Sequence, residues 1–534
     1  MQPAERNQHR AAFHQAPPRF PQGDPAAIPF AADGSGLEAL LQLGYAAAAR
    51  GENARAAAIL DRVAREHPGQ PHPCADLARV LPKVPRARIA AQFRACRRLA
   101  PEDVRVCEAY ADYLLESDQS ELAVPVLETW ARYQPQSAAA QTMLGIVHTE
   151  LGQFDAALGH LQQAVALAPG KAAAWANLGM LLKATGALQP ALDAYEQAIL
   201  RDPENPRIRV NRTVALLHAG CWTEAWRDYE CRLRLPGRQR TGAGPLLPSL
   251  SHLNALDGRT VLVTHEEGFG DTIQFMRYLP LLAARGARVL LWVPEPLERL
   301  AERVDGVAEV LCGNLPVPAH DYHCPVLSLP RAFETTPATV PNRPYLSADP
   351  ARAAWWAGRL PQDGLRVGLV WAGQSRPWLP GFAALDRRRS AELAAFAPLA
   401  AVPGVNFVSL QKGAAAEAPG PAGLRLTDPS AELTDFAETA ALVANLDLVI
   451  SVDTAVVHLA GAMGKPVFML DRYDNCWRWL SGRADSPWYP GMTIFRQEVP
   501  GDWTAPMQRA AAALQAWALF RGTASLRGLS LAHV

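Results

Sequence analysis

The segment 144–169 recurs in the segment 178–203 after a shift of 34 residues. The first reads LGIVHTELGQFDAALGHLQQAVALAP, and the second reads LGMLLKATGALQPALDAYEQAILRDP. Small residues at matched positions let two helices approach closely, glycine turns the chain between them, and proline ends the second helix. The matched pairs include Gly152 and Gly186, Ala157 and Ala191, and Pro169 and Pro203. The repeat predicts an α superhelix of stacked helix pairs.

The repeat extends in both directions and resembles the tetratricopeptide pattern. Proline recurs upstream in the same phase, and three residues continue the phase downstream: Pro68, Pro101, Pro135, Gly220, Ala225 and Tyr229. We therefore expect about six units over residues 37–236. The alternative is an ordinary helical bundle with chance self-similarity. A solenoid of this kind binds an extended peptide or another protein on its concave face, so we assign the array to partner recognition.

Composition narrows the range of partners and compartments. Acidic and basic residues balance at 52 each, which gives no support for a nucleic-acid or anionic-membrane partner. The eight cysteines are scattered, without a C-x-x-C pair or a Cys/His cluster, which fits a reducing compartment. The chain has no uninterrupted apolar stretch of about 18 residues, so the sequence does not predict a membrane-spanning helix. We expect a soluble, cytoplasmic protein with a disordered arm over residues 1–36.

The second half of the chain alternates short β-rich runs with helical patterns after a linker at 237–258. Residues 260–265 and 288–293 are strands of a first set, and a second set follows the Pro-rich stretch 337–350 at 366–372, 405–410, 446–451 and 465–470. Strands that alternate with helices predict parallel sheets. We expect two Rossmann-like lobes, at 259–350 and 351–534, the second with a C-terminal helix, and a ligand at the carboxyl ends of the strands.

One strand-to-helix junction of the second lobe carries polar residues. The run LDLVIS (446–451) is followed by Asp453 and Thr454, and His458 comes one turn into the next helix. A cap residue, free amides and the helix dipole together form an anion site. His458 is placed to touch a phosphate or a sugar. In the alternative interpretation, Asp453 only caps the helix and His458 only packs.

The matching junction of the first lobe carries an acid. After the first strand comes a loop with His265, Glu266, Glu267, Gly268 and Gly270, and Asp271 then opens a helix. The glycines allow a tight turn and close approach of a substrate. A carboxylate at this point is well placed to accept a proton from an attacking hydroxyl. Its alternative role is that of a plain helix N-cap.

These motifs resemble those of the heptosyltransferase-type glycosyltransferases of GT-B fold, glycosyltransferase family 9. The resemblance covers about 259–505 and rests on the G-x-G-D loop, on GLVWAG (368–373) and on DTAVVHLAGAMGKPV (453–467). Together with the repeats, it extends to bacterial repeat-containing glycosyltransferases, among them flagellin glycosyltransferases that use a nonulosonic acid donor. It implies an inverting reaction with Asp271 as the general base. It also implies an acceptor loop formed by Glu267, Gly268 and Gly270. The donor site that it implies is formed by Asp453, Thr454 and His458.

The chain departs from the family pattern after the first strand of the second lobe. The family's lipopolysaccharide enzymes carry a hydroxyl-rich segment and a lysine there, whereas this chain has WAGQSRPWLPGFAALDRRRS (371–390). Arg388 or Arg389, with Ser390, is a candidate for the phosphate contact, because arginine binds phosphate bidentately. The alternative is a solvated basic run. Lys412 is a second donor-binding candidate.

Two further features concern the donor. Residues 474–490 carry four aromatic side chains, which either stack on the base or sugar or belong to the core. No D-x-D pair is present to hold a metal on a diphosphate, so we expect a metal-independent reaction without a cofactor, in which cations and helix amides stabilise the leaving phosphate.

The sequence therefore predicts transfer of a sugar from a nucleotide-activated donor to a hydroxyl of a protein held by the repeats. Flagellin is the acceptor that the resemblance suggests. Two alternatives stay open: an interaction scaffold without catalysis, and a transferase that acts on a lipopolysaccharide-type glycan.

Overall fold

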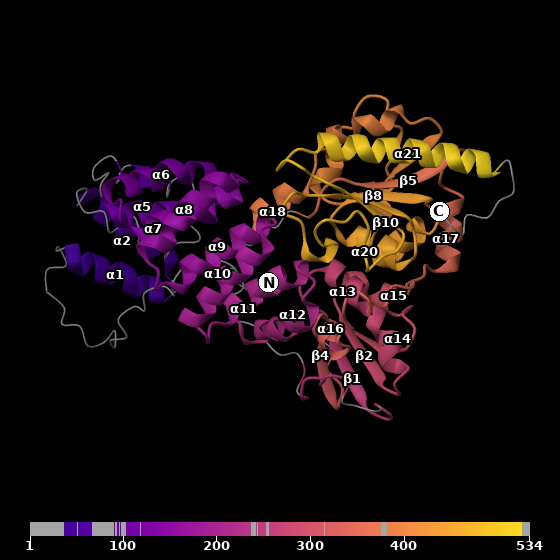
Figure 1. Cartoon of the computed structure of the whole chain (residues 1–534), viewed down its shortest axis with the longest axis horizontal. Helices are drawn as coiled ribbons and strands as arrows, with labels where there is room; N and C mark the ends of the chain where they lie inside the picture. Colours follow the sequence, from indigo (N-terminus) through magenta and orange to yellow (C-terminus); the bar gives the residue numbers. More distant parts are fainter. Residues whose placement is uncertain are drawn as a thin grey trace. The chain divides into compact units, whose positions relative to one another are not determined.

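The computed structural model describes residues 37–50, 52–66, 90, 93–94, 97, 103–117, 119–236, 242, 244–251, 256–313, 316–374 and 382–525 (Figure 1). The N-terminal arm expected at 1–36 and part of the linker expected at 237–258 lie outside these residues. The chain divides into two compact units. The first holds residues 1–182, 193–204 and 376–384, and the second holds residues 183–192, 205–375 and 385–534.

Helix pairs build the repeat region, as the 34-residue period predicts. The helices are α1 (Leu37–Ala49), α2 (Asn53–Glu66), α5 (Val104–Glu116), α6 (Ser120–Tyr133), α7 (Ala138–Glu150), α8 (Phe154–Leu167), α9 (Ala172–Ala184) and α10 (Leu188–Arg201). Gly152 and Gly186 turn the chain between paired helices with φ of 73° and 81°. A side chain at Gly145 of α7 would overlap Leu161 of α8. The predicted helical solenoid is confirmed.

The last helix pair shares its core with the α/β region of the second unit. It consists of α11 (Pro206–His218) and α12 (Trp222–Tyr229), followed by the 3₁₀ segment η2 (Glu230–Arg234). Trp222 stacks on Trp488 with ring centroids 5.2 Å apart. Trp226 donates its indole N–H to the carbonyl of Thr335 at 2.8 Å. Both tryptophans of this helix pair therefore pack against the α/β region.

The first lobe is a four-stranded parallel sheet in the order β3-β2-β1-β4. Its strands are β1 (Thr260–Thr264), β2 (Arg288–Val293), β3 (Val307–Cys312) and β4 (Tyr322–Pro325). The helices α13 (Phe269–Phe275), α14 (Leu279–Ala283), α15 (Glu298–Ala301) and α16 (Leu329–Ala332) follow the strands. Val261 and Val263 of β1 pack in the main core, whereas Leu262 points to the opposite face, as strand alternation requires.

The second lobe is a six-stranded parallel sheet in the order β10-β9-β8-β5-β6-β7. Its strands are β5 (Leu365–Val370), β6 (Val405–Ser409), β7 (Leu426–Thr427), β8 (Leu448–Val452), β9 (Val467–Asp471) and β10 (Met492–Arg496). Every residue of β8 is buried, which explains its continuous apolar run. The predicted parallel α/β region with two sheets is confirmed, and its arrangement is consistent with GT-B-like lobes.

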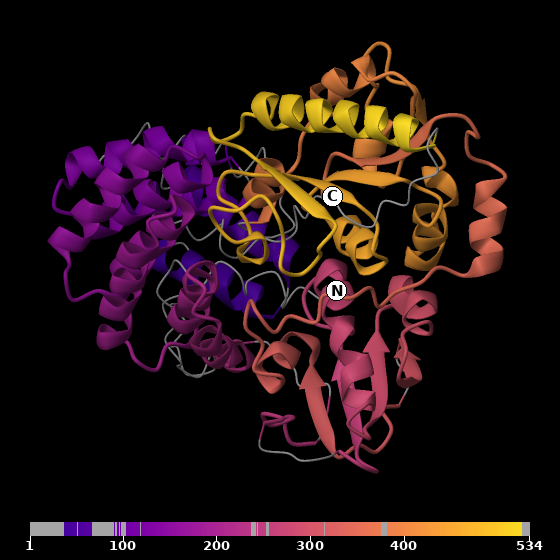
Figure 2. The same ribbon diagram turned by 45° about the vertical axis from the view of Figure 1, so that its right-hand side comes forward.

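Helices cover both faces of the second sheet. α21 (Thr504–Ser525) runs along one face, and α19 (Phe436–Val443) and α20 (Ala455–Ala462) lie against the other, where the first lobe begins (Figures 1 and 2). The remaining helices, α17 (Pro350–Ala357) and α18 (Phe382–Arg389), precede and follow β5.

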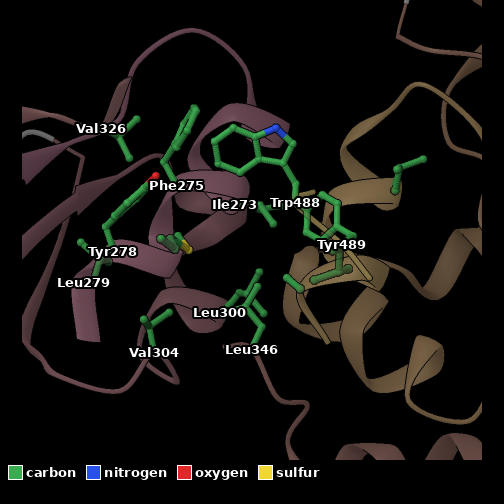
Figure 3. Close-up of a cluster of buried hydrophobic side chains, with 14 of the residues drawn as sticks. Ile273, Phe275, Tyr278, Leu279, Leu300, Val304, Val326, Leu346, Trp488 and Tyr489 are labelled. Atoms are coloured by element: carbon green, nitrogen blue, oxygen red, sulfur yellow. The ribbon is translucent and has the colours of Figure 1, made fainter. Parts of the chain in front are cut away.

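The two lobes meet in one hydrophobic cluster (Figure 3). Trp488 and Tyr489 extend from the second lobe toward Ile273 and Phe275 of α13. The rings of Phe275 and Trp488 meet edge to face with centroids 5.7 Å apart. Arg277, 3% exposed, donates to the carbonyl of Trp488 at 2.9 Å. This shared core holds α13 against α20, and both helices begin at predicted site junctions.

Candidate active site

The two predicted junctions contact each other. A Cβ atom at Gly270 would lie 2.8 Å from Cδ2 of His458 and 3.3 Å from Cα of Ala455. Gly270 is therefore required for the close approach of α13 to α20. The left-handed residue of the loop is Glu267, with φ of 62°, whereas Gly268 has φ of −98°. Neither glycine has a positive φ, and Gly270 serves close packing between the lobes.

Asp271 is held by both lobes. It is the third residue of α13, after the N-cap Gly268, so its side chain caps the start of the helix from the third position rather than from the N-cap position. Its Oδ2 accepts a hydrogen bond from the amide of Gly268 at 2.9 Å. Its Oδ1 forms an ion pair with Arg478 of the 3₁₀ segment η9 (Trp477–Trp479). The Asp271 side chain keeps 23% exposure, so the carboxylate is fixed and still reaches solvent.

His458 is packed at the same junction. Its Nδ1 lies 2.9 Å from the hydroxyl of Tyr489, and its ring stacks on Trp479 with centroids 5.3 Å apart. Burial, followed by the charges of Arg478 and Arg277, holds the pKa of His458 well below its ordinary value. The imidazole is therefore neutral at pH 7. Contact of His458 with a donor stays a prediction.

Asp453 and Thr454 directly follow β8. Thr454 is the N-cap of α20, with φ of −138° and ψ of 171°, and its side chain makes no hydrogen bond to the helix. The hydroxyl lies 3.2 Å from that of Ser451 instead. The first turn of α20 therefore receives no acceptor from its cap side chain, which suits an anion site.

Arg388, Arg389 and Ser390 lie beside the loop that follows β5. The amide of Gly373 donates to Oγ of Ser390 at 3.1 Å. A Cβ atom at Gly373 would lie 2.6 Å from Cζ of Arg389, so this guanidinium rests against the loop. Arg388 donates to Asp474 at 3.0 Å. Strand order reverses between β5 and β8, and parallel sheets bind ligands at such a reversal.

Lys412 is not brought to this place. It follows β6, is exposed, and donates its ammonium group to the carbonyl of Ser430 at 2.7 Å. Of the predicted cations, Arg388 and Arg389 lie beside the strand-order reversal.

Several charged residues of this region were not predicted from the sequence. Asp471 ends β9 fully buried, and its Oδ2 accepts from Arg496 at 2.9 Å. Burial raises the pKa of Asp471 to about 7; the charge of Arg496 opposes this shift and that of Asp453 adds to it. Arg472 pairs with Asp474 at 3.1 Å. The sequence feature that could have indicated them is DRYD (471–474), a charged run directly after the apolar residues of β9.

The aromatic run at 474–490 belongs to the core. Trp477, Trp479, Trp488 and Tyr489 are all less than 9% exposed. The same run also brings Arg478 to Asp271, and the Nε of Arg478 donates to Gln274 at 2.6 Å. Sequence reasoning considered only the aromatic side chains.

The described part of the chain contains no group of three or more His, Cys, Asp or Glu side chains that could hold a metal ion. Among the same residues, no helix has the length and apolar character needed to cross a membrane.

Comparison with known proteins identifies both regions. A profile of glycosyltransferase family 9 (heptosyltransferase) matches residues 431–498, and tetratricopeptide-repeat profiles match residues 38–69, 109–172 and 142–206. The chain is therefore similar to tetratricopeptide-repeat proteins over those segments and to glycosyltransferase family 9 over residues 431–498. The family 9 match includes Asp453, Thr454, His458 and Arg478, and it supports a glycosyltransferase.

Similarity to a curated relative extends over most of the chain. Protein FlbA of Caulobacter vibrioides is 28% identical over 488 residues, which cover 83% of this chain and 78% of FlbA.

Solved structures match over a smaller part of the chain. A thermophilic tetratricopeptide-repeat protein of Thermus thermophilus is 25% identical, with 34% of this chain and all of that chain covered and a TM-score of 0.28. MamA from Desulfovibrio magneticus is 21% identical, with 32% and 96% covered and a TM-score of 0.28.

Proposed function

We propose that the protein transfers a sugar from a nucleotide-activated donor to a hydroxyl group of a protein acceptor, in a GT-B-type reaction that inverts the anomeric carbon. The observation that carries this proposal is the meeting of the two junctions. Asp271 of the first lobe is paired with Arg478 of the second lobe, and the neighbouring Gly270 lies against Ala455 and His458 in the first turn of α20.

Asp271 acts as the general base. The acceptor oxygen attacks the anomeric carbon, its proton passes to the carboxylate, and the bond from that carbon to the donor phosphate breaks. Arg478 and the Gly268 amide each engage one carboxylate oxygen, which fixes its orientation. Each oxygen has a further lone pair, so the carboxylate can still accept the proton.

The second lobe stabilises the leaving phosphate. The first amides of α20 and the guanidinium groups of Arg388 and Arg389 supply positive charge at the carboxyl ends of β5 and β8. Asp453, Thr454, Ser390 and His458 contact the phosphate or sugar in this proposal. We propose that no metal takes part, because these groups supply the charge that a metal would otherwise bring.

The repeats hold the acceptor. A tetratricopeptide solenoid suits an extended peptide, and a protein hydroxyl then reaches Asp271. Flagellin is the acceptor suggested by the resemblance to repeat-containing glycosyltransferases.

The test is product analysis with the full chain. The protein is incubated with nucleotide sugars and with unmodified flagellin, and intact mass spectrometry follows the acceptor while chromatography follows nucleotide release. We expect an acceptor mass increase equal to one or more sugars, equal nucleotide release, and no effect of a chelator. Transfer to a lipopolysaccharide-type glycan but not to protein would contradict the acceptor assignment, and absence of transfer to either would contradict the enzyme assignment.

A further inference from the structure

Arg232 is buried at the carboxyl ends of β1 and β4. It belongs to η2, the segment that follows the last repeat helix, and is 1% exposed. Its Nε and Nη2 donate to the two carboxylate oxygens of Glu266 at 2.9 and 2.8 Å. Nη2 also donates to Oγ of Ser328 at 2.7 Å. Glu266 follows β1 and Ser328 follows β4, so one guanidinium bridges both strand ends.

This position is the one at which sheets of this topology bind ligands. The order β3-β2-β1-β4 reverses between β1 and β4, and the crevice beyond the strand ends lies there. In this chain, a side chain from the end of the repeats occupies it. Burial alone would lower the pKa of Arg232, but the charge and hydrogen bonds of Glu266 outweigh burial and raise that pKa. The guanidinium therefore stays charged in its ion pair with Glu266.

The bridge fixes the start of the loop that carries Asp271. Glu266 is 8% exposed, and each of its oxygens accepts from Arg232. The next residue, Glu267, takes a left-handed φ of 62°, and the amide of Gly268 then donates to Asp271. The backbone from Glu266 to Asp271 is thus held at both ends. Without Arg232, Glu266 would be a buried charge lacking its main partner and would move toward water.

We propose that Arg232 is a positioning residue that sets the geometry of the acceptor loop from the end of the repeat array. This inference rests on the proposed function, in which Asp271 is the base. It makes the placement of the base depend on η2, a segment outside both sheets. The local contacts of Arg232 fit this role, because Nη1 donates to Glu230 at 2.9 Å and the guanidinium lies 4.6 Å from the Tyr229 ring centroid.

Arg232→Lys in the full chain tests the inference. Lysine keeps the positive charge but loses the two-pronged contact with Glu266. We expect faster amide hydrogen exchange at residues 266–271 and a loss of roughly ten- to a hundredfold in kcat, with donor KM unchanged. The matched control is Arg234→Lys, because Arg234 is an exposed arginine of the same segment. If Arg232→Lys does not fold, the double variant Arg232→Met with Glu266→Leu replaces the buried pair by apolar side chains and leaves no buried charge unpaired. Because the hydrogen bonds that hold residue 266 are then absent, we again expect faster exchange at residues 266–271 and a lower kcat than in Arg234→Lys.

Two readouts separate the possible failures. Loop exchange and kcat that both equal those of Arg234→Lys would overturn the inference, as would faster exchange with unchanged kcat. A parallel Asp271→Asn variant tests the proposed function itself. If that variant keeps full turnover while Arg232→Lys still loosens the loop, the base assignment fails and Arg232 stays a holder of the loop only.

Discussion

Arg478 of the second lobe donates a hydrogen bond to Asp271 of the first lobe, although 207 positions separate the two residues in the chain. The same arginine donates to Gln274 of α13 at 2.6 Å, and its guanidinium lies over the Trp477 ring at 4.4 Å. Arg478 therefore does two things at once. It holds α13 to the second lobe, and it orients the carboxylate assigned as the base.

Arg478→Met should weaken both the fold and the reaction. The variant leaves Asp271 without its charged partner and Gln274 without its donor, so we expect the free energy of unfolding to fall by about 1–3 kcal/mol. Turnover should fall as well, because the carboxylate loses its orientation. Urea denaturation and steady-state kinetics measure the two effects. The control is Arg483→Met, which removes a more exposed pair with Asp485 and should cost roughly 0–1 kcal/mol.

Gly270→Ala should push the two junctions apart. The added methyl would lie 2.8 Å from His458, so we expect a loss of about 1–3 kcal/mol in unfolding free energy. Donor affinity measured by calorimetry should fall with it, because α20 shifts. Gly159→Ala is the control, since nothing lies within 4 Å of a Cβ at that position. Equal unfolding free energies of the two variants would contradict this prediction, because they would show that the added methyl fits between α13 and α20.

Stability should depend on the ionisation of Asp471. Its pKa is about 7 in the folded chain against an ordinary 3.8, so between these values the folded state holds a proton that the unfolded state has lost. This contribution is full below about pH 4 and disappears as the pH rises through about 7. The unfolding free energy of Asp471→Asn minus that of the wild type should therefore be larger at pH 8 than at pH 5. A pH-independent difference in denaturant titrations would contradict this.

Trp222→Ala should destabilise the α/β region, although Trp222 belongs to a repeat helix. Trp222 is 1% exposed, stacks on Trp488, and donates its indole N–H to Leu217 at 3.0 Å. We expect a loss of about 3–5 kcal/mol in the full chain. Trp355→Ala serves as the control, because that ring is 38% exposed. If the repeat array of Trp222→Ala melts separately while the melting transition of the α/β region is unchanged, the prediction of a shared core is wrong.

The fold was predictable because its patterns are local. The repeat of 34 residues predicted the helix pairs, and apolar runs such as LDLVIS predicted buried parallel strands. Asp271, Asp453 and Thr454 stood out because each follows a strand at its carboxyl end, a position that sequence alone can recognise. The same reasoning could not place their partners in space.

The partners of the site residues were not predictable. Arg232 and Glu266 lie 34 positions apart on different elements, and nothing in either local pattern announces the pair. Arg478 lies inside the run 474–490, in which the sequence analysis considered only the aromatic side chains. Lys412 had a suitable local pattern, since it follows a strand, but that strand lies on the far side of β5 from β8 and the side chain bonds to Ser430. Strand order, which the sequence did not reveal, decides such cases.

Turnover of Asp271→Asn tests the central claim most directly. Asparagine keeps the size of the side chain and an oxygen that can accept from Gly268, but it cannot take the acceptor proton. With nucleotide release measured at saturating donor and acceptor, we expect a loss of at least roughly a hundredfold in kcat, with an intact fold by circular dichroism and donor affinity near that of the wild type. His265→Gln, in the same loop, should keep most of the activity. Full turnover in a folded Asp271→Asn variant would contradict the account and move the search for the base to Glu267 and His265.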